Sequence, residues 1–219
     1  MTDAATIGPQ PRVLYYVQHL LGIGHLARAS HIVQALAEND FEVTLVTGGM
    51  PVAGFPADGI DHVALPPIAV GDGGFSQLVD ADGDPVDDAF KARRRDLLLA
   101  TYREKRPDIV ILEAFPFGRR QVRFELLPLI EAIEATRPRP LLLTSLRDIL
   151  QERAKPGRDE ETVDLVHRYF DRVLVHGDPT FVRLEDTFPL ARSIVDQVVY
   201  TGLVTGRPPA APAESFDIV

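Results

Sequence analysis

Short apolar runs alternate along this chain of 219 residues with segments in which apolar residues recur at helical spacing. The runs are expected to form strands at residues 12–17, 41–46, 62–65, 108–112, 140–144, 172–175 and 197–200. The segments between them are expected to form helices at residues 24–37, 87–103, 119–136, 160–169 and 180–188. Strands that alternate with helices form a parallel sheet buried on both faces. The sequence therefore predicts a doubly wound, Rossmann-like α/β domain with about seven parallel strands and helices on both faces.

Two segments interrupt this alternation. Residues 68–85 are rich in glycine and aspartate and are too long for an ordinary connection, so we expect a functional or mobile loop. Residues 206–213 are rich in proline and alanine, and residues 216–219 resemble the start of another buried strand. We therefore expect an N-terminal domain at 1–205, followed at 206–219 by a linker and the beginning of a second domain.

Charge and composition exclude several classes of function. The formal net charge of −9 argues against a nucleic-acid partner, because phosphate binding needs a cationic face. The absence of cysteine excludes disulfides and thiolate metal sites, and four histidines, His19, His31, His62 and His167, show no metal-binding spacing. No apolar run approaches the roughly 20 residues that span a bilayer, and the first residues lack the features of a signal peptide. We expect a cytoplasmic protein without a metal.

The turn at residues 22–25 follows the first expected strand, at the edge where open parallel sheets bind ligands. Gly22 and Gly24 allow a tight turn and a close backbone approach, and free N–H groups at the helix start can hold an anion. Together with Ala27 they match the dinucleotide pattern G-x-G-x-x-A. The second strand, however, ends without the acidic residue that would hold a ribose. The pattern alone therefore gives little support to a dinucleotide site.

His25 and Glu113 are the candidate catalytic residues. The positive end of the helix dipole and Arg28, one turn further on, both disfavour a charged His25 imidazole. A neutral imidazole can act as a general base, although a capping or packing histidine is the alternative. Glu113 ends the expected strand at 108–112, so its carboxylate is expected to enter the same crevice and orient His25. The alternative for Glu113 is a cap of a helix or loop.

Further polar residues follow the next two expected strands. Ser145 and Arg147 are suited to an anionic or hydroxylated ligand, and His176 lies either in the crevice or in loop packing. A basic cluster on the expected helix at 87–103 is typical of a solvated face, with contact to an anionic acceptor or membrane surface as the alternative. Its members are Lys91, Arg93, Arg94 and Arg95.

The segment at residues 22–28, G-x-G-H-x-x-R between a strand and a helix, resembles the N-terminal domain of GT-B glycosyltransferases. The resemblance is greatest to bacterial glycosyltransferases related to the enzyme that adds N-acetylglucosamine in peptidoglycan synthesis. Tyr200, Thr201 and Gly202 resemble the segment that leaves that domain. The resemblance covers residues 12–204.

The resemblance implies an acceptor-side domain, which holds a small molecule or a glycolipid, and a second domain that holds a nucleotide-sugar, taken here as UDP-linked. It implies that His25 is the base, that Glu113 orients it, and that no further cofactor is needed. Peripheral membrane contact would accompany a glycolipid acceptor. A sugar-nucleotide 2-epimerase of the same architecture and a non-catalytic binding domain are the alternatives. The residues assigned to substrate binding are Gly22, Gly24, Arg28, Ser145, Arg147 and His176.

Overall fold

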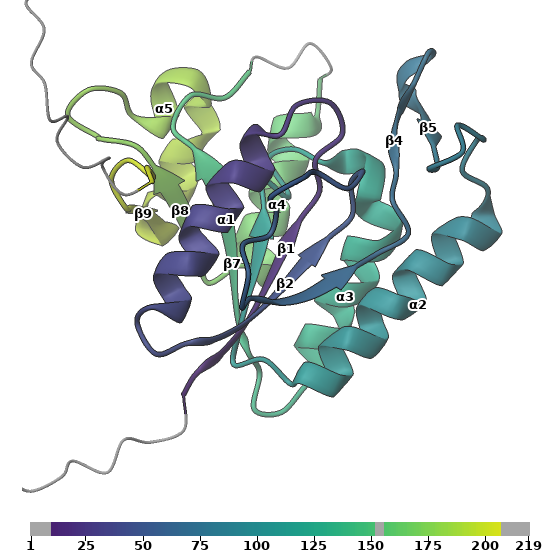
Figure 1. Ribbon diagram of the computed structural model, residues 1–219. Coiled ribbons are helices and arrows are strands. Elements are labelled where there is room, and N and C mark those ends of the chain that lie inside the picture. The colour runs from purple at the N-terminus through teal and green to yellow at the C-terminus, as the bar shows by residue number, and fades with distance from the viewer. Residues whose placement is uncertain (1–9, 152–155, 207–219) are drawn as a thin grey trace, which may run out of the picture.

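The computed structural model describes residues 10–151 and 156–206, apart from the side chains of residues 75 and 76. Seven parallel strands form one sheet in the order β3-β2-β1-β6-β7-β8-β9 (Figure 1). Their bounds are β1 Arg12–Val17, β2 Glu42–Thr47, β3 Asp61–Ala64, β6 Ile109–Glu113, β7 Leu141–Arg147, β8 Arg172–His176 and β9 Val198–Tyr200. The predicted fold is confirmed, and β1 has the predicted bounds. The sequence placed the end of β7 too early, because its last three residues are not uniformly apolar.

Helices cover both faces of the sheet (Figure 1). Alternate residues of β1 point to opposite faces: Val13 and Tyr15 pack with α1, whereas Leu14 and Tyr16 pack in the core that includes α2 and α3. The helices are α1 Gly24–Ala37, α2 Asp88–Lys105, α3 Arg123–Ala135, α4 Arg158–Tyr169 and α5 Leu184–Thr187, with 3₁₀ helices η1 Arg120–Val122 and η2 Pro189–Gln197. Each face of the sheet therefore has its own apolar core.

The segment at 68–85 contains a hairpin that the sequence analysis did not predict. Strands β4 (Ala69–Gly71) and β5 (Gly74–Val79) pair antiparallel and stand out from the body of the molecule at the upper right of Figure 1. Gly74, with φ of 71°, adopts the left-handed backbone conformation that favours glycine in such a turn. The glycine-rich stretch is therefore a hairpin turn within the expected loop.

Arg94 contradicts the prediction that the basic cluster at residues 91–95 is a solvated face. Its side chain is fully buried, and it forms two hydrogen bonds with the equally buried Glu125, at 2.7 and 2.9 Å. Arg94 also donates to Gln18 Oε1 at 3.0 Å, and the Tyr16 hydroxyl donates to Glu125. The ion pair joins α2 to α3 beneath β1. Helical charge spacing on its own could not distinguish this inward arginine from its solvated neighbours.

The chain leaves the sheet after β9 through residues 201–206. Of the predicted linker and start of a second domain at 206–219, only Gly206 belongs to the described residues. Among the helices of the described residues, none is both long and apolar enough to cross a membrane.

Candidate active site

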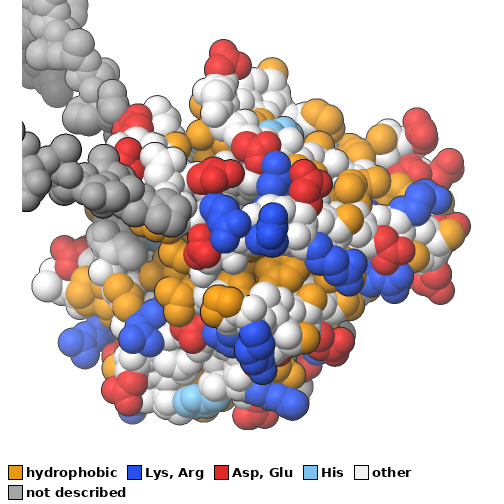
Figure 2. All heavy atoms as spheres, turned by 90° about the horizontal axis from the view of Figure 1, so that it is seen from below, with side chains coloured by type: hydrophobic (Ala, Val, Ile, Leu, Met, Phe, Trp, Pro, Cys, Tyr) orange, Lys and Arg blue, Asp and Glu red, His pale blue; other side chains and the backbone are white. Residues whose placement is uncertain are grey.

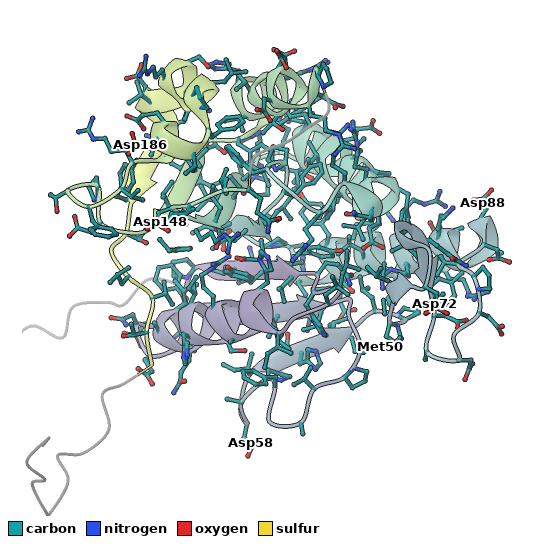
Figure 3. The ribbon with its side chains drawn as sticks, turned by 90° about the horizontal axis from the view of Figure 1, so that it is seen from above. Met50, Asp58, Asp72, Asp88, Asp148 and Asp186 are labelled. Atoms are coloured by element: carbon teal, nitrogen blue, oxygen red, sulfur yellow. The ribbon has the colours of Figure 1, made fainter. Side chains whose placement is uncertain are left out.

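The strand order places a switch point between β1 and β6. From β1 the chain proceeds to β2 and β3 on one side, then crosses to β6, β7, β8 and β9 on the other. Ligands of open α/β sheets bind at such a point, outside the carboxyl ends of the strands. His25 lies in the first turn of the helix that follows β1, and Glu113 is the last residue of β6. Figure 3 looks onto this edge from above, with Met50 and Asp148 labelled in the loops after β2 and β7.

The imidazole of His25 is held by the carboxylate of Glu113. The distance from Nδ1 to Oε1 is 2.9 Å, and Arg28 contacts the same carboxylate oxygen. The Glu113 side chain is fully buried, whereas 29% of the His25 side chain is exposed. An ionised carboxylate can only accept hydrogen bonds, so Nδ1 carries the hydrogen. The lone pair of Nε2 then remains available to a ligand.

Glu113 is ionised because its surroundings outweigh its burial. Its Oε2 accepts hydrogen bonds from the hydroxyls of Tyr15, at 2.7 Å, and Ser145, at 2.6 Å. Burial alone would raise the pKa of Glu113, but the hydrogen bond from His25, the charge of Arg28 and the two hydroxyls lower it to about 2. These four donors match the roughly four lone-pair positions of a carboxylate.

His176 extends this network toward the end of β9. Its Nε2 lies 2.8 Å from Ser145 Oγ, and its Nδ1 lies 2.6 Å from Thr201 Oγ1. Since the Ser145 hydroxyl donates to Glu113, the serine oxygen accepts from His176, and Nδ1 accepts from Thr201. Burial lowers the pKa of His176 to about 4, with a smaller contribution from Arg28 and an opposing one from Glu113. His176 is therefore neutral at pH 7.

A cavity of about 330 Å³ opens beside His25. Its walls come from the start of α1, the loop after β6, the end of β7 and the start of α4. The lining residues are His25, Arg28, Ala114, Phe117, Gly118, Arg119, Leu146, Arg147, Leu150, Gln151 and Arg158. Four of these residues are arginines and none is acidic, so the cavity is cationic.

Two solved glycosyltransferases have this fold over most of the chain. One, from Rickettsia africae, is similar over 88% of this chain and 43% of its own, with 12% sequence identity and a TM-score of 0.55. The other, the glycotransferase of kitacinnamycin, is similar over 95% of this chain and 56% of its own, with 13% identity and a TM-score of 0.52. The chain has the GT-B N-terminal fold. The resemblance seen in residues 22–28 is thus confirmed at the level of the fold.

The GT-B N-terminal fold also occurs in a UDP-N-acetylglucosamine 2-epimerase from Rickettsia bellii. That protein is similar over 89% of this chain and 45% of its own, with 11% identity and a TM-score of 0.52. The chain thus spans about half the length of each of these three proteins. No protein-family model matches the sequence, and no curated protein matches it.

The predicted site residues occupy two layers of this fold. His25, Arg28 and Arg147 line the cavity. Ser145 and His176, by contrast, are buried in the hydrogen-bond network behind Glu113. The structure therefore brings all five residues to one edge of the sheet, but only the first group lines the cavity beside His25.

Gly22, in the turn before α1, and Gly24, the first residue of α1, are both exposed. Neither has a positive φ, and a Cβ added to either would meet no atom within 4 Å. The backbone and packing of this domain therefore do not require glycine at these positions. The open space in front of the turn remains available to a ligand.

Several residues of the site were missed in the sequence. Tyr15 was assigned to an apolar strand, although a buried tyrosine hydroxyl needs a hydrogen-bond partner, and that need was the available signal. Thr201 was noted as part of the exit segment without a role, and Arg119 was not singled out. No group of three or more potential metal ligands occurs within the described ranges.

The stability of the folded chain is expected to fall as the pH is lowered from 6.5 to about 4, in part because of His176. The unfolded chain takes up a proton at His176 near its ordinary pKa of 6.5, whereas the folded chain does so only near 4. Stability from this residue is therefore complete above pH 6.5 and decreases below it. The difference between these two pKa values corresponds to a loss of about 3 kcal/mol in the free energy of unfolding. Urea unfolding at several pH values measures it.

The control is a pair of histidine variants. Burial also lowers the pKa values of His19 and His62, so the wild-type slope contains their contributions. His176→Asn should flatten the dependence of unfolding free energy on pH, whereas His167→Asn, at an exposed position on α4, should not. If the unfolding free energies of wild type and His176→Asn depended on pH in the same way, His176 would not be a source of the dependence.

Proposed function

We propose that this domain holds the acceptor in a sugar transfer for which His25 is the general base. The observation that carries the proposal is the hydrogen bond of 2.9 Å between His25 Nδ1 and the ionised Glu113. It fixes the tautomer, leaves Nε2 as the basic atom, and holds the ring on the wall of the cavity. The similarity of fold to two glycosyltransferases supports this choice of reaction.

In the proposed reaction, an acceptor hydroxyl donates its hydrogen bond to His25 Nε2. The hydroxyl oxygen attacks the anomeric carbon of the sugar, and the bond from that carbon to the nucleotide diphosphate breaks. The diphosphate leaves with the electron pair, and the proton of the hydroxyl passes to Nε2. Glu113 stabilises the imidazolium that forms, because its negative charge lies 2.9 Å from Nδ1. The step requires no metal ligand from the described residues.

The donor in this proposal is a UDP-linked sugar, held by a second domain. The matched glycosyltransferases are about twice as long as this chain, which supports a second half. The acceptor is a small molecule or a glycolipid. We place the reaction in the cytoplasm, with peripheral membrane contact if the acceptor is a glycolipid.

The test is an assay with a protein that contains both halves, in which UDP-sugars and candidate acceptors are incubated and the products are analysed by mass spectrometry. Transfer of a sugar to an acceptor is the expected result. The chain of 219 residues alone is expected to transfer none. Transfer by this chain would contradict the assignment of the donor to a second half, and binding of UDP-sugars without any turnover would favour a non-catalytic binding domain.

A sugar-nucleotide 2-epimerase is the second candidate, because a UDP-N-acetylglucosamine 2-epimerase has the same fold. The cavity favours the transferase: no carboxylate of the described residues lines it, and Glu113 is fully buried behind His25. Product analysis distinguishes the two, since an epimerase would convert UDP-N-acetylglucosamine in the absence of any acceptor.

A further inference from the structure

More arginines line the cavity beside His25 than the carboxylates of the described residues pair with. Arg28, Arg119, Arg147 and Arg158 reach it from four separate parts of the chain, and none of its described lining residues is acidic. This concentration of positive charge occurs in a chain whose formal net charge is −9. Arg28 is accounted for, because it pairs with Glu113. Arg119 and Arg147 are not accounted for in this way.

Arg119 is a half-buried cation whose Nε is buried without a hydrogen-bond partner among the described residues. Its burial lowers the pKa of its guanidinium, with Glu113 opposing this effect. Both Arg119 and Ala114 have left-handed backbone conformations, with φ of 58° and 64°, so the loop after β6 is held in an unfavourable shape. A buried N–H group of a guanidinium without an acceptor is costly, and an anion would supply the missing acceptor for Nε.

Arg147 completes the pair from the end of β7. Its side chain is exposed, and no described carboxylate pairs with it. A planar guanidinium can give two parallel hydrogen bonds to a phosphate or a carboxylate. Two such groups on one cavity, together with the positive end of α1, form a field suited to an oxyanion.

A cluster of arginines at the opposite edge of the sheet shows that arginines alone do not indicate an anion site. Seen from below, this edge carries Lys and Arg side chains interspersed with Asp and Glu (Figure 2). A cavity of about 320 Å³ there is also lined by arginines, but it includes Asp108, which pairs with Arg12 at 3.2 Å. Arg137 of that cavity donates to backbone carbonyls of its own segment. Arg12 and Arg137 therefore have their partners within the protein.

We propose that Arg119 and Arg147 bind a phosphate group of the acceptor. This inference rests on the proposed function for the identity of the ligand as acceptor, whereas the anion site itself stands on the geometry of the cavity. Because His25 lines the same cavity, a bound phosphate would lie on the same small molecule or glycolipid as the reacting hydroxyl. The diphosphate of the donor offers the same chemistry, so the experiment must separate these two sources.

The test measures binding to the chain of 219 residues by calorimetry, with pyrophosphate, glycerol 3-phosphate and UDP as probes. Saturable, salt-sensitive binding is expected for the first two, with UDP binding no tighter than pyrophosphate. Arg119→Gln and Arg147→Gln should each weaken the binding by about tenfold or more, the usual effect of losing a charged hydrogen-bond donor. Arg192→Gln is the matched control, because Arg192 is exposed on η2 and lies outside the cavity.

Several outcomes would overturn the proposal. Absence of saturable binding, or an equal loss in Arg192→Gln, would contradict the anion site. UDP binding at least tenfold tighter than pyrophosphate would assign the arginines to the donor. Arg147→Gln keeps the test decisive if Arg119→Gln does not fold, because Arg147 is exposed. His25→Ala should retain anion binding, so a failure of the base role and a failure of the phosphate site remain distinguishable.

Discussion

Replacing His25 by alanine is expected to lower the turnover of a protein that contains both halves by about 10²–10⁴-fold, the usual contribution of a general base. The structure gives the reason: Nε2 is the only basic atom that the Glu113 interaction leaves on the ring. Steady-state kinetics measure the effect, which should fall on kcat, with the KM for the nucleotide-sugar little changed. His25→Ala with near-normal turnover would contradict the role.

Two further variants separate the base from its support. His167→Ala changes an exposed histidine on α4 and should leave turnover unchanged. Glu113→Gln should reduce kcat, because an amide is neutral and brings a donor group into a position surrounded by donors. If Glu113→Gln retained full activity while His25→Ala lost it, Glu113 would not be the group that orients the base.

Arg94→Met is expected to lower the free energy of unfolding by about 3–5 kcal/mol, because it leaves the carboxylate of Glu125 buried without its charged partner. Both side chains are fully buried, and the Glu125 carboxylate accepts two of the hydrogen bonds that Arg94 donates. Urea denaturation followed by circular dichroism measures the change.

The same helix supplies the control for this prediction. Arg93→Met alters an exposed neighbour on α2 and should change stability by less than about 0.5 kcal/mol. Arg94→Met combined with Glu125→Met removes both charges, so its loss should be smaller than the sum of the two single losses. Additive losses would show that the ion pair is not the source of the effect.

The strands could be predicted because burial on both faces of a parallel sheet leaves continuous apolar runs. The pairing of His25 with Glu113 could be predicted for a related reason, since His25 follows β1 and Glu113 ends β6 at the same carboxyl edge. The hairpin of β4 and β5 could not be predicted in this way. Its strands are short and lie among glycine and aspartate residues, and they pair with each other outside the main sheet.

The inward or outward direction of polar side chains was the part that the sequence left open. Ser145 and Arg147 were treated alike because both follow the same run, but one is buried against Glu113 and the other is exposed at the cavity. Tyr15 and Tyr16 are adjacent, yet each bonds to a different buried carboxylate on its own face of the sheet. Strand alternation explains the two tyrosines. Ser145 and Arg147, by contrast, lie two residues apart on the same face of β7, and they differ because Ser145 is paired with Glu113 of β6 whereas Arg147 is the last residue of its strand.

The complete set of donors around Glu113 has a consequence for the dynamics of the site. The carboxylate needs neither a water molecule nor a ligand to satisfy it, since His25, Arg28, Tyr15 and Ser145 already occupy its oxygens. The imidazole is therefore preorganised in the ligand-free protein, and little reorganisation of its surroundings should accompany the arrival of an acceptor. We expect any rearrangement on binding to be concentrated in the arginines of the cavity wall, with the hydrogen bonds behind the base unchanged.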